Sequence, residues 1–383
     1  MELQIPESDK ALQEKARQFM TRHLLPLESQ FLAGASLPDD SVKTLRAMLA
    51  AAGLDRPQIP GSLGGRCPGF LSQCLVQDEL SYSVVGTELC LEENLQLLRQ
   101  HATVAQEERF VRPMAHGKLH SCFALTEPDA GSDIQSIRAT AVHCGSYYSL
   151  SGYKAYVRGL SGAGVVLVVA RTDTGDEQGL TVWLVDRNDP GLRVAADRRL
   201  LSVERVFDLA LSDCRLPPER MLGGPGQGPA IVASRLRSAE IFSAARCNGM
   251  ARRCLDLALQ QVQRRCAFGG PLSQLQIVQH QLAERATELH AARLLVVAAA
   301  SHLDSGQQAD AQVAVAKTHA AETARRVADT TVQLHGAQGC VVGTAPEFLY
   351  RSSRLGLIAN VPTELHRVQI AEAILDRLGG SAG

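Results

Sequence analysis

The chain has 383 residues, of which 45% are hydrophobic and 21% are charged, and its formal net charge is -1. This length exceeds the usual size of one hydrophobic core, so we expect two or three packed regions. The near-neutral charge supplies no positive field that would attract nucleic acid or an anionic membrane, which favours small-molecule chemistry.

The sequence carries no signal for membrane insertion or export. No apolar run approaches the roughly 20 residues that span a bilayer. The first 20 residues lack the basic start and the apolar stretch of a signal peptide. These features predict a cytoplasmic protein.

The ten cysteines form neither a C-x-x-C pair nor a Cys/His cluster, so no metal site is expected. Free cysteine is readily buried as a small apolar residue, and these positions are predicted to be reduced structural thiols. They are residues 67, 74, 90, 122, 144, 214, 247, 254, 266 and 340.

The N-terminal part of the chain has helical periodicity. From about Ser8 to Leu98, apolar residues recur at the spacing shown by Leu12, Ala16 and Phe19, with proline- and glycine-rich breaks at 57–65. This pattern predicts a bundle of short helices, which we assign to an N-terminal helical domain over residues 1–118.

The residue pattern in the middle of the chain is typical of a β domain. From about Cys122 to Leu222, short runs rich in Val, Tyr and Leu alternate with Gly, Asp and Asn, as in AGVVLVVARTD and LTVWLVDR. We expect a middle β domain over residues 119–222.

The remainder, residues 223–383, returns to long helical patterns. The stretches from Leu272 to Leu303 and from Ala309 to Leu334 each carry apolar residues on a 3.6-residue period. Two such helices predict an antiparallel bundle. The predicted fold class is mainly α with a central β domain.

The segment FALTEPDAGSD, Phe123 to Asp133, opens the β region and is rich in hydrogen-bonding groups. It combines hydroxyls at Thr126 and Ser132 with backbone donors around Gly131. Such groups suit the polar edge of a planar heterocycle, whose buried acceptors need partners. The alternative is an ordinary Pro/Gly turn that joins a helix to a strand.

TEPDAGSD resembles the T-E-P-x-A-G-S-D signature of acyl-CoA dehydrogenases, and further resemblances follow in the family's order over nearly the whole chain. They are IPGSLGG (59–65), GYKAYV (152–157), RRCAFGGPLSQLQIVQHQLAE (264–284), QLHGAQG (333–339) and LYRSSRLGLIANVPTELHR (349–367).

The resemblance implies an N-terminal helical domain, a middle β-barrel-like domain and a C-terminal four-helix bundle, with FAD between domains and across the interface of a homodimer or homotetramer. Tyr156 stands where the family usually has a flavin-packing tryptophan. By position, the residues beside the flavin or substrate are Phe123, Leu125, Thr126, Gly131, Ser132, Tyr156, Val157 and Arg158.

Four other positions would reach the FAD of a neighbouring subunit, namely Arg265, Phe268, Gln333 and Gly336. Outside the family context, Phe268 would be read as core and Arg265 as a cation at the C-terminal end of its helix. Within it, an arginine fork is better explained as a partner of the pyrophosphate.

The sequence departs from the family at the catalytic base. Dehydrogenation of a thioester needs a partly desolvated carboxylate to take a proton. Aligning the family's Y-E-G-T segment with this chain places Asn360 at that glutamate. Asparagine cannot serve as the base.

Two other carboxylates are candidates. Glu364 follows Asn360 by four residues and would lie on the same face if the segment is helical. Some relatives carry the base about ten residues before a helical glycine; here that position is Ala239, and Glu240 follows it, turned by about 100°. Glu364 is the stronger candidate, unless it only pairs with neighbouring charges or solvent.

Other departures affect the cofactor edge. Arg158 occupies the place of a threonine whose hydroxyl contacts flavin N5 in the family, and Pro362 replaces another threonine. A displaced base and flavin edge suit removal of a γ proton from a 2-enoyl thioester, with hydride leaving the δ carbon. The sequence thus resembles the secondary-metabolism branch of the family that makes γ,δ-unsaturated thioesters, as in the tacrolimus allylmalonyl extender-unit pathway.

The family's anchors for fatty acyl-CoA are also altered, because the Asp and Arg of that segment align with Arg237 and Glu240. A short acyl group on CoA or on a carrier protein is therefore expected, with an electron acceptor that the sequence does not identify; neutral drift at exposed positions is the alternative. Ordinary α,β-desaturation, a noncatalytic flavin-binding partner subunit and a flavin oxidase or oxygenase remain as other functions.

Overall fold

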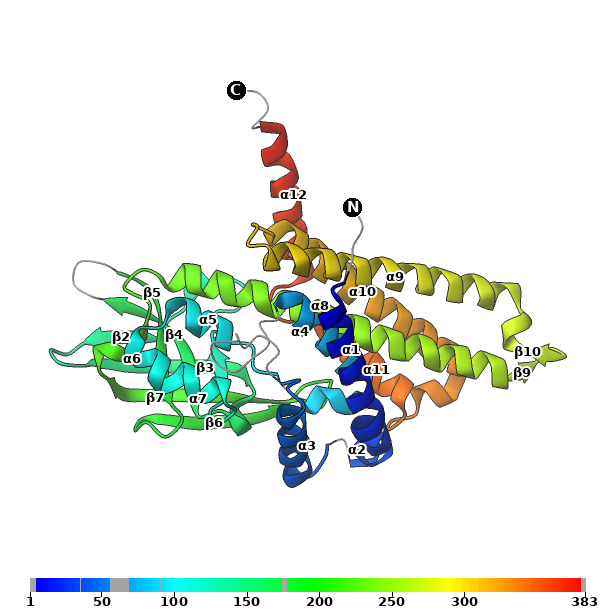
Figure 1. Ribbon diagram of the computed structural model, residues 1–383, viewed down its shortest axis with the longest axis horizontal. Helices are drawn as coiled ribbons and strands as arrows, with labels where there is room; N and C mark the ends of the chain where they lie inside the picture. Colours follow the sequence, from blue (N-terminus) through cyan, green and yellow to red (C-terminus); the bar gives the residue numbers. More distant parts are fainter. Residues whose placement is uncertain (1–4, 35, 56–68, 90, 174–177, 380–383) are drawn as a thin grey trace. The chain divides into compact units, whose positions relative to one another are not determined.

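The computed structural model describes residues 5–34, 36–55, 69–89, 91–173 and 178–379. Helical segments precede and follow a central β-sheet (Figure 1), which confirms the predicted fold class. The chain divides into two compact units. The first contains Met1–Pro60, Gly65–Leu89 and Arg237–Gly383, and the second contains Gly61–Gly64 and Cys90–Leu236.

The first unit begins with short helices, as the periodicity predicts. Ala16 and Phe19, from the predicted apolar stripe, are buried. Asp304 accepts hydrogen bonds from the backbone N–H groups of Phe70 and Leu71 and so caps the fourth helix. The segment IPGSLGG lies outside the described residues. The helices are α1 (Glu7–Phe19), α2 (Glu28–Gly34), α3 (Asp39–Ala51) and α4 (Phe70–Leu80).

The second unit is built around an eight-stranded sheet with the order β6-β7-β3-β2-β4-β5-β8, and β1 pairs with β4 in parallel. The strands are β1 (Ser121–Ala124), β2 (Thr140–His143), β3 (Tyr148–Arg158), β4 (Val165–Asp173), β5 (Gln178–Asp186), β6 (Leu192–Arg199), β7 (Arg205–Leu216) and β8 (Met221–Leu222). Three short helices precede them: α5 (Leu95–His101), α6 (Val104–Gln106) and α7 (Arg112–Ala115).

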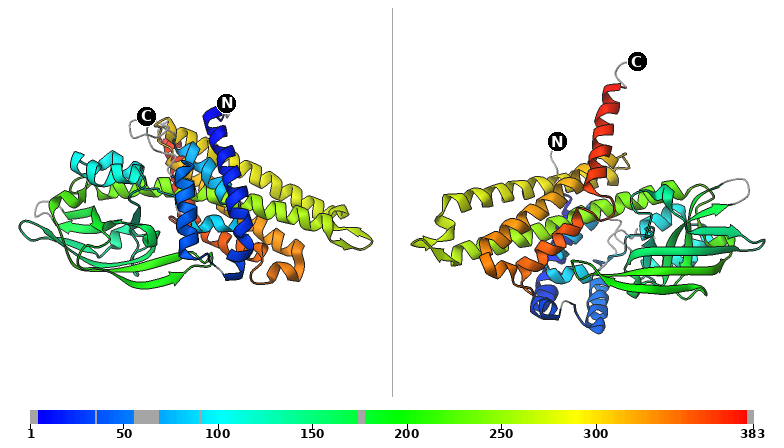
Figure 2. Two further views of the ribbon diagram at one scale, coloured as in Figure 1. Left: turned by 60° about the horizontal axis from the view of Figure 1, so that its bottom comes forward. Right: turned by 180° about the vertical axis from the view of Figure 1, so that it is seen from behind.

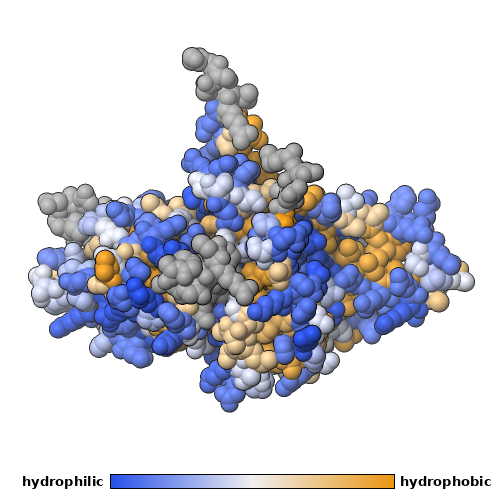
Figure 3. Space-filling view, in the orientation of Figure 1, coloured by the Kyte–Doolittle hydropathy of each residue, from blue (hydrophilic) through white to orange (hydrophobic). Residues whose placement is uncertain are grey.

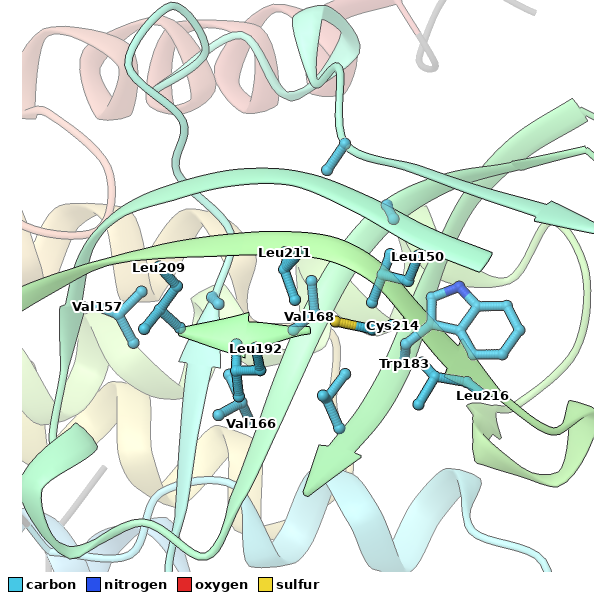
Figure 4. Close-up of a cluster of buried hydrophobic side chains, with 14 of the residues drawn as sticks. Leu150, Val157, Val166, Val168, Trp183, Leu192, Leu209, Leu211, Cys214 and Leu216 are labelled. Atoms are coloured by element: carbon cyan, nitrogen blue, oxygen red, sulfur yellow. The ribbon is translucent and has the colours of Figure 1, made fainter. Parts of the chain in front are cut away.

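One face of this sheet carries an apolar core, shown in Figure 4. Val166 and Val168 of β4 belong to this core, and the residues between and beside them are buried as well, so both faces of this strand are covered. Trp183 is fully buried, and its indole N–H donates to the Thr172 hydroxyl at 3.1 Å. The strands beneath the loop at Phe123 to Asp133 are therefore a rigid support for it.

The remainder of the first unit is a set of long helices, visible in the two views of Figure 2. The predicted helices at Leu272–Leu303 and Ala309–Leu334 are found as α9 and α10, which pack against each other. The elements are α8 (Gly228–Arg264, whose first residues belong to the second unit), β9 (Cys266–Ala267), β10 (Gly270–Pro271), α9 (Gln276–Asp304), α10 (Asp310–His335), α11 (Ala345–Gly356) and α12 (Thr363–Gly379).

Within the described residues, no helix is long and apolar enough to cross a membrane.

Candidate active site

The backbone of the loop that follows β1 is fixed by a buried ion pair. The Glu127 carboxylate accepts hydrogen bonds from the backbone N–H groups of Arg138 and Ala139, at 2.7 and 3.0 Å, and from the Lys154 ammonium at 2.7 Å. Lys154 is fully buried and also donates to the Leu125 carbonyl at 2.9 Å. The loop is thus held from strand β3.

Both charges of this pair are shifted by their surroundings. Burial opposes ionisation of Glu127, but the hydrogen bonds from Lys154 and two backbone groups outweigh it and lower the carboxyl pKa. Burial lowers the pKa of the Lys154 ammonium. The pair contributes rigidity to the loop rather than an accessible acid or base.

The outer part of the same loop offers polar groups to a ligand. Thr126 is half-buried, and Gly131 and Ser132 are exposed. A Cβ atom at Gly131 would meet nothing within 4 Å, so a ligand can approach the backbone there. In the described part of the chain neither the Thr126 nor the Ser132 hydroxyl has a hydrogen-bond partner. These free groups fit the polar edge of a bound flavin.

Tyr156 projects from a β-bulge at the end of β3. Ala155 and Tyr156 together oppose the single residue Asp208 on β7, and Tyr156 has a positive φ of 58°. The Asp208 carboxylate accepts a hydrogen bond from the Tyr156 N–H at 3.2 Å. As a result the Tyr156 side chain is 53% exposed, whereas the Val157 side chain is buried in the sheet core. Val157 can therefore offer only its backbone to a cofactor.

A polar hollow of about 320 Å³ lies beside Tyr156. Asp208 forms one wall, where its carboxylate also accepts from the Tyr153 hydroxyl at 3.2 Å and from the Arg198 guanidinium at 2.7 Å. The lining residues are Pro128, Tyr153, Ala155, Tyr156, Arg198 and Asp208. No sequence motif marks Asp208 or Arg198, and neither was expected at the site.

Arg158, expected at the flavin edge, is engaged in an ion pair. Its Nε and Nη2 atoms lie 2.6 and 2.5 Å from Glu204 Oε1, in the turn between β6 and β7. The carboxylate neutralises the charge that the sequence places at this edge. The substitution of threonine by arginine is thus accompanied by a counter-charge.

A second charged group lies next to Phe123. The Arg235 guanidinium sits 5.5 Å from the centre of the Phe123 ring, and its Nη2 atom is 3.0 Å from the Glu93 carboxylate. Arg235 Nε also donates to the Asn94 side-chain oxygen at 2.5 Å. The Phe123 ring therefore borders a polar cluster, which the sequence did not indicate.

The four residues expected to reach a neighbouring subunit gather at one end of the helical bundle. Leu334, between Gln333 and Gly336, packs in one cluster with Val262 and Val278, which flank the β9–β10 hairpin. At the tip of this hairpin Phe268 has a φ of 52° and is 94% exposed, so it is not core. Arg265, Gln333 and Gly336 are also exposed.

Asn360 lies in a turn between α11 and α12 and not in a helix, with a φ of 63°. Its side-chain amide donates to the Ala239 carbonyl on α8 at 3.1 Å. Since α12 begins at Thr363, the helical condition that would place Asn360 and Glu364 on one face is not met. The spacing argument for Glu364 is wrong in that respect, because the chain turns between the two residues.

The two candidate bases have different surroundings. Glu364 is exposed in the first turn of α12. Glu240 is 7% exposed, and burial raises its pKa to about 7, with Lys317 opposing the shift. Because Glu240 is buried, neutral drift at an exposed position does not explain it. Arg237 is partly exposed and pairs with Asp310 at 2.6 Å.

His366 and Lys317 complete the surroundings of Glu240. His366 Nε2 lies 4.0 Å from a Glu240 carboxylate oxygen, and burial lowers the imidazole pKa to about 4. The Lys317 ammonium donates to the Val361 carbonyl at 2.6 Å, and burial lowers its pKa. An acid that titrates near neutral pH thus lies near the turn that carries Asn360, as general acid–base chemistry requires.

The cysteine prediction holds in part. Among the described residues five cysteines are buried and free, but Cys144, Cys266 and Cys340 are exposed, because they lie after a strand end, in a hairpin and at the end of a 3-10 helix. Cys67 and Cys90 fall outside the described residues. No group of three or more potential metal ligands occurs among the residues described.

Comparison with known proteins matches the chain to three family models. They are the N-terminal, middle and C-terminal domains of acyl-CoA dehydrogenases, over residues 6–118, 122–213 and 226–375. The short-chain specific acyl-CoA dehydrogenase of Mus musculus mitochondria is 30% identical over 97% of this chain and 91% of its own. Acryloyl-CoA reductase (NADH) of Anaerotignum propionicum is 29% identical, over 98% and 97%.

Among solved structures, butyryl-CoA dehydrogenase from Megasphaera elsdenii superposes with a TM-score of 0.91 at 25% identity. The superposition covers 98% of this chain and 100% of that one. The order of helices, sheet and helices described above is therefore shared along the whole length.

Proposed function

Because the chain belongs to the acyl-CoA dehydrogenase family, we propose that it desaturates a short acyl thioester at the γ,δ position of a 2-enoyl thioester. The family consists of FAD-binding oxidoreductases that act on CH–CH groups, and this chain is an FAD-dependent oxidoreductase of that type. The observation that carries the finer proposal is Asn360, an amide tied to Ala239 where the family places its catalytic carboxylate.

The substrate proposal follows from the relatives and from the altered anchors. The relatives act, by their names, on short-chain acyl-CoA and acryloyl-CoA. In this chain Arg237 is paired with Asp310 and Glu240 is buried, which supports a thioester held differently from fatty acyl-CoA. We propose a short acyl group on CoA or on a carrier protein, in the biosynthesis of a polyketide extender unit.

The proposed reaction removes a γ proton and a δ hydride, so that a second double bond forms in conjugation with the first. Bound FAD supplies the hydride acceptor. Glu364 accepts the γ proton, and the Asn360 backbone N–H, for which the described residues provide no acceptor, donates to the thioester carbonyl. Thr126 and Ser132 would bind polar atoms of the cofactor, and Tyr156 would pack against it.

A second candidate is ordinary α,β-desaturation with Glu240 as the base. Its support is specific: Glu240 is desolvated and its pKa of about 7 matches the working range of a general base. Glu364, by contrast, is exposed and has to be desolvated by the substrate. The position of the new double bond in the product separates the two candidates.

The base is tested by measuring single-turnover flavin reduction in the Glu364→Gln and Glu240→Gln variants. We expect Glu364→Gln to slow reduction about 10²-fold or more, since a general base contributes that much. A larger loss in Glu240→Gln, with Glu364→Gln near the wild-type rate, would assign the base to Glu240. If no thioester reduces the flavin unless a homologous subunit is added, the chain is a noncatalytic partner.

We also propose a homo-oligomer in which one subunit completes the FAD site of another. The support is the exposed set formed by Arg265, Phe268, Gln333 and Gly336 at one end of the bundle. The exposed phenylalanine at the hairpin tip is apolar surface in contact with water, and a partner subunit that covered it would gain from its burial. The guanidinium of Arg265 would bind phosphate oxygens there.

A further inference from the structure

Lys317 is an unexpected charge in the helical bundle. It lies in α10, its relative exposure is 0%, and its neighbours along the helix include the buried Val313, Ala316 and Ala320. Placing an ammonium in such surroundings costs several kcal/mol. An apolar side chain would stabilise this helix more, so stability alone does not account for the residue.

The Lys317 ammonium has one hydrogen-bond acceptor among the described residues. Of the three protons on Nζ, the described residues accept one, through the Val361 carbonyl at 2.6 Å. Val361 follows Asn360, whose own side chain donates to the Ala239 carbonyl at 3.1 Å. Two successive residues of the turn are thereby tied to two different helices, α10 and α8.

The turn needs such ties because its backbone is strained. Asn360 has a φ of 63°, a region that costs L residues about 1 kcal/mol or more. Within the turn, the Thr363 N–H donates to the Leu357 carbonyl at 3.1 Å. Without the Lys317 bond, the Val361 carbonyl would lose its partner and the turn would gain freedom.

We propose that Lys317 is a positioning residue, which through its bond to Val361 fixes the turn that carries Asn360 relative to the two carboxylates, Glu240 and Glu364. The inference rests on the proposed function, because it assigns Lys317 to the proposed catalytic site. Lys317 touches no reacting atom. It acts by holding the groups that do, and such preorganisation is worth large factors in rate.

The charge of Lys317 gives this role a measurable signature. Glu240 is faced by His366 from α12, by Lys317 and Asp310 from α10, and by Arg237 on its own helix. The positive charge of Lys317 lowers the Glu240 pKa against the larger effect of burial, and the charges of Glu240 and Glu364 both favour the protonated Lys317. Removing the charge therefore raises the Glu240 pKa.

The test compares Lys317→Met, which removes both the donor and the charge, with Lys317→Gln, which keeps a donor and removes the charge. Thr331→Val is the matched control, because Thr331 is fully buried in the same helix and its hydroxyl bonds the Cys254 carbonyl at 2.9 Å. Two quantities are measured on the FAD-loaded protein: hydrogen exchange of residues 357–363, and the pH profile of flavin reduction by a 2-pentenoyl thioester.

For Lys317→Met we expect faster exchange in residues 357–363, about 10-fold or more slower flavin reduction at saturating thioester, and a KM within a few-fold of wild type. The inflection that the titration of Glu240 adds to the pH profile should move to higher pH, while Glu364 remains the base. Lys317→Gln should restore the exchange protection but keep the shifted Glu240 inflection. Thr331→Val should change neither.

Wild-type exchange and a wild-type pH profile in Lys317→Met would overturn the inference, as would equal changes in Thr331→Val. The proposed function fails in a different way, since the wild-type flavin is then reduced by no thioester. In that case the exchange of residues 357–363 still decides whether Lys317 holds the turn.

Discussion

Glu240 and His366 have opposite responses to the same burial. The carboxyl pKa is raised to about 7 and the imidazole pKa is lowered to about 4, with 4.0 Å between their nearest N and O atoms. Both groups are therefore mostly neutral in the mildly acidic range. Burial disfavours whichever form is charged, which is why the shifts have opposite directions.

This arrangement predicts a pH-dependent stability change in Glu240→Gln. The folded pKa of Glu240 lies above its unfolded value, so its contribution to stability is complete below about pH 4.5 and is lost as the pH rises through 7. Glutamine does not ionise. Relative to wild type, the variant should gain on the order of 2–3 kcal/mol between pH 4.5 and pH 8.5.

Midpoints of chemical unfolding at the two pH values measure this difference. His366 loses its stabilising contribution as the pH falls from about 6.5 toward 4, but it does so in both proteins and cancels. Glu364→Gln is the matched control, since that carboxylate is exposed. An equal stability difference at both pH values would show that Glu240 ionises as freely in the folded protein as in the unfolded chain.

Among the elements, β3 and β7 set the direction of the Tyr156 side chain through the bulge opposite Asp208. The positive φ of Tyr156 is maintained by the bond from its N–H to the Asp208 carboxylate, which Arg198 also neutralises. Bulges of this kind re-aim a side chain beside active sites. The orientation of Tyr156 therefore depends on both strands and not on this residue alone.

We therefore predict that Asp208→Ala weakens FAD binding by about 10-fold or more, because loss of charge-assisted hydrogen bonds costs about 1.5–3 kcal/mol. Asp208→Asn, which keeps an acceptor oxygen, should lose less. Asp213→Ala is the control on the same strand, where the carboxylate is exposed and bonds Ser149. The dissociation constant is measured from flavin fluorescence; equal affinities for Asp208→Ala and Asp213→Ala would contradict the prediction.

The helices were predictable from sequence because their apolar periods are long. The expected stretch from Ala309 to Leu334 is α10 to within one residue at each end, and that from Leu272 to Leu303 begins with a short 3-10 turn before α9. The buried Lys317 lies within the Ala309–Leu334 stretch without disturbing the pattern. Periodicity reports which face is buried, and it does not show which polar group shares that face.

The site was less predictable, because its geometry depends on turns. The motif predicts that the Thr126 and Ser132 hydroxyls line a polar ligand edge; the structure leaves Thr126 half-buried and Ser132 exposed, and their role stays a prediction. The relation of Asn360 to Glu364 was misjudged, since a positive φ precedes the helix start and spacing arguments hold only within regular helix. The burial of Glu240 beside His366 joins residues 126 positions apart, which no local pattern reveals.

At the scale of the whole molecule, exposed apolar side chains point to a partner subunit. Phe268 is 94% exposed, and α12, which extends away from the other helices of its unit in Figure 1, carries exposed Val368, Ile374 and Leu375. Apolar surface on this helix is visible in Figure 3. Such exposure on a folded chain is typical of an interaction surface.

Phe268→Ala should leave the stability of the protomer within about 0.5 kcal/mol, because the side chain has almost no contacts to lose. In an assembly where Phe268 reaches a neighbour's FAD, the same change should lower the flavin content after gel filtration. Val104→Ala is the control, since Val104 is 80% exposed and belongs to no expected site. Unchanged flavin content, with an unchanged mass by light scattering, would show that Phe268 does not contribute to the cofactor site.

The most direct test of the account is anaerobic mixing of the purified, FAD-loaded protein with 2-pentenoyl and pentanoyl thioesters, on CoA and on a carrier protein, while the flavin absorbance is followed. Because Asn360 leaves the usual position of the base without a carboxylate, we predict that the 2-enoyl thioester bleaches the flavin and the saturated thioester does not. Bleaching of the flavin by the pentanoyl thioester, with no 2-enoyl thioester present, would contradict γ,δ-desaturation.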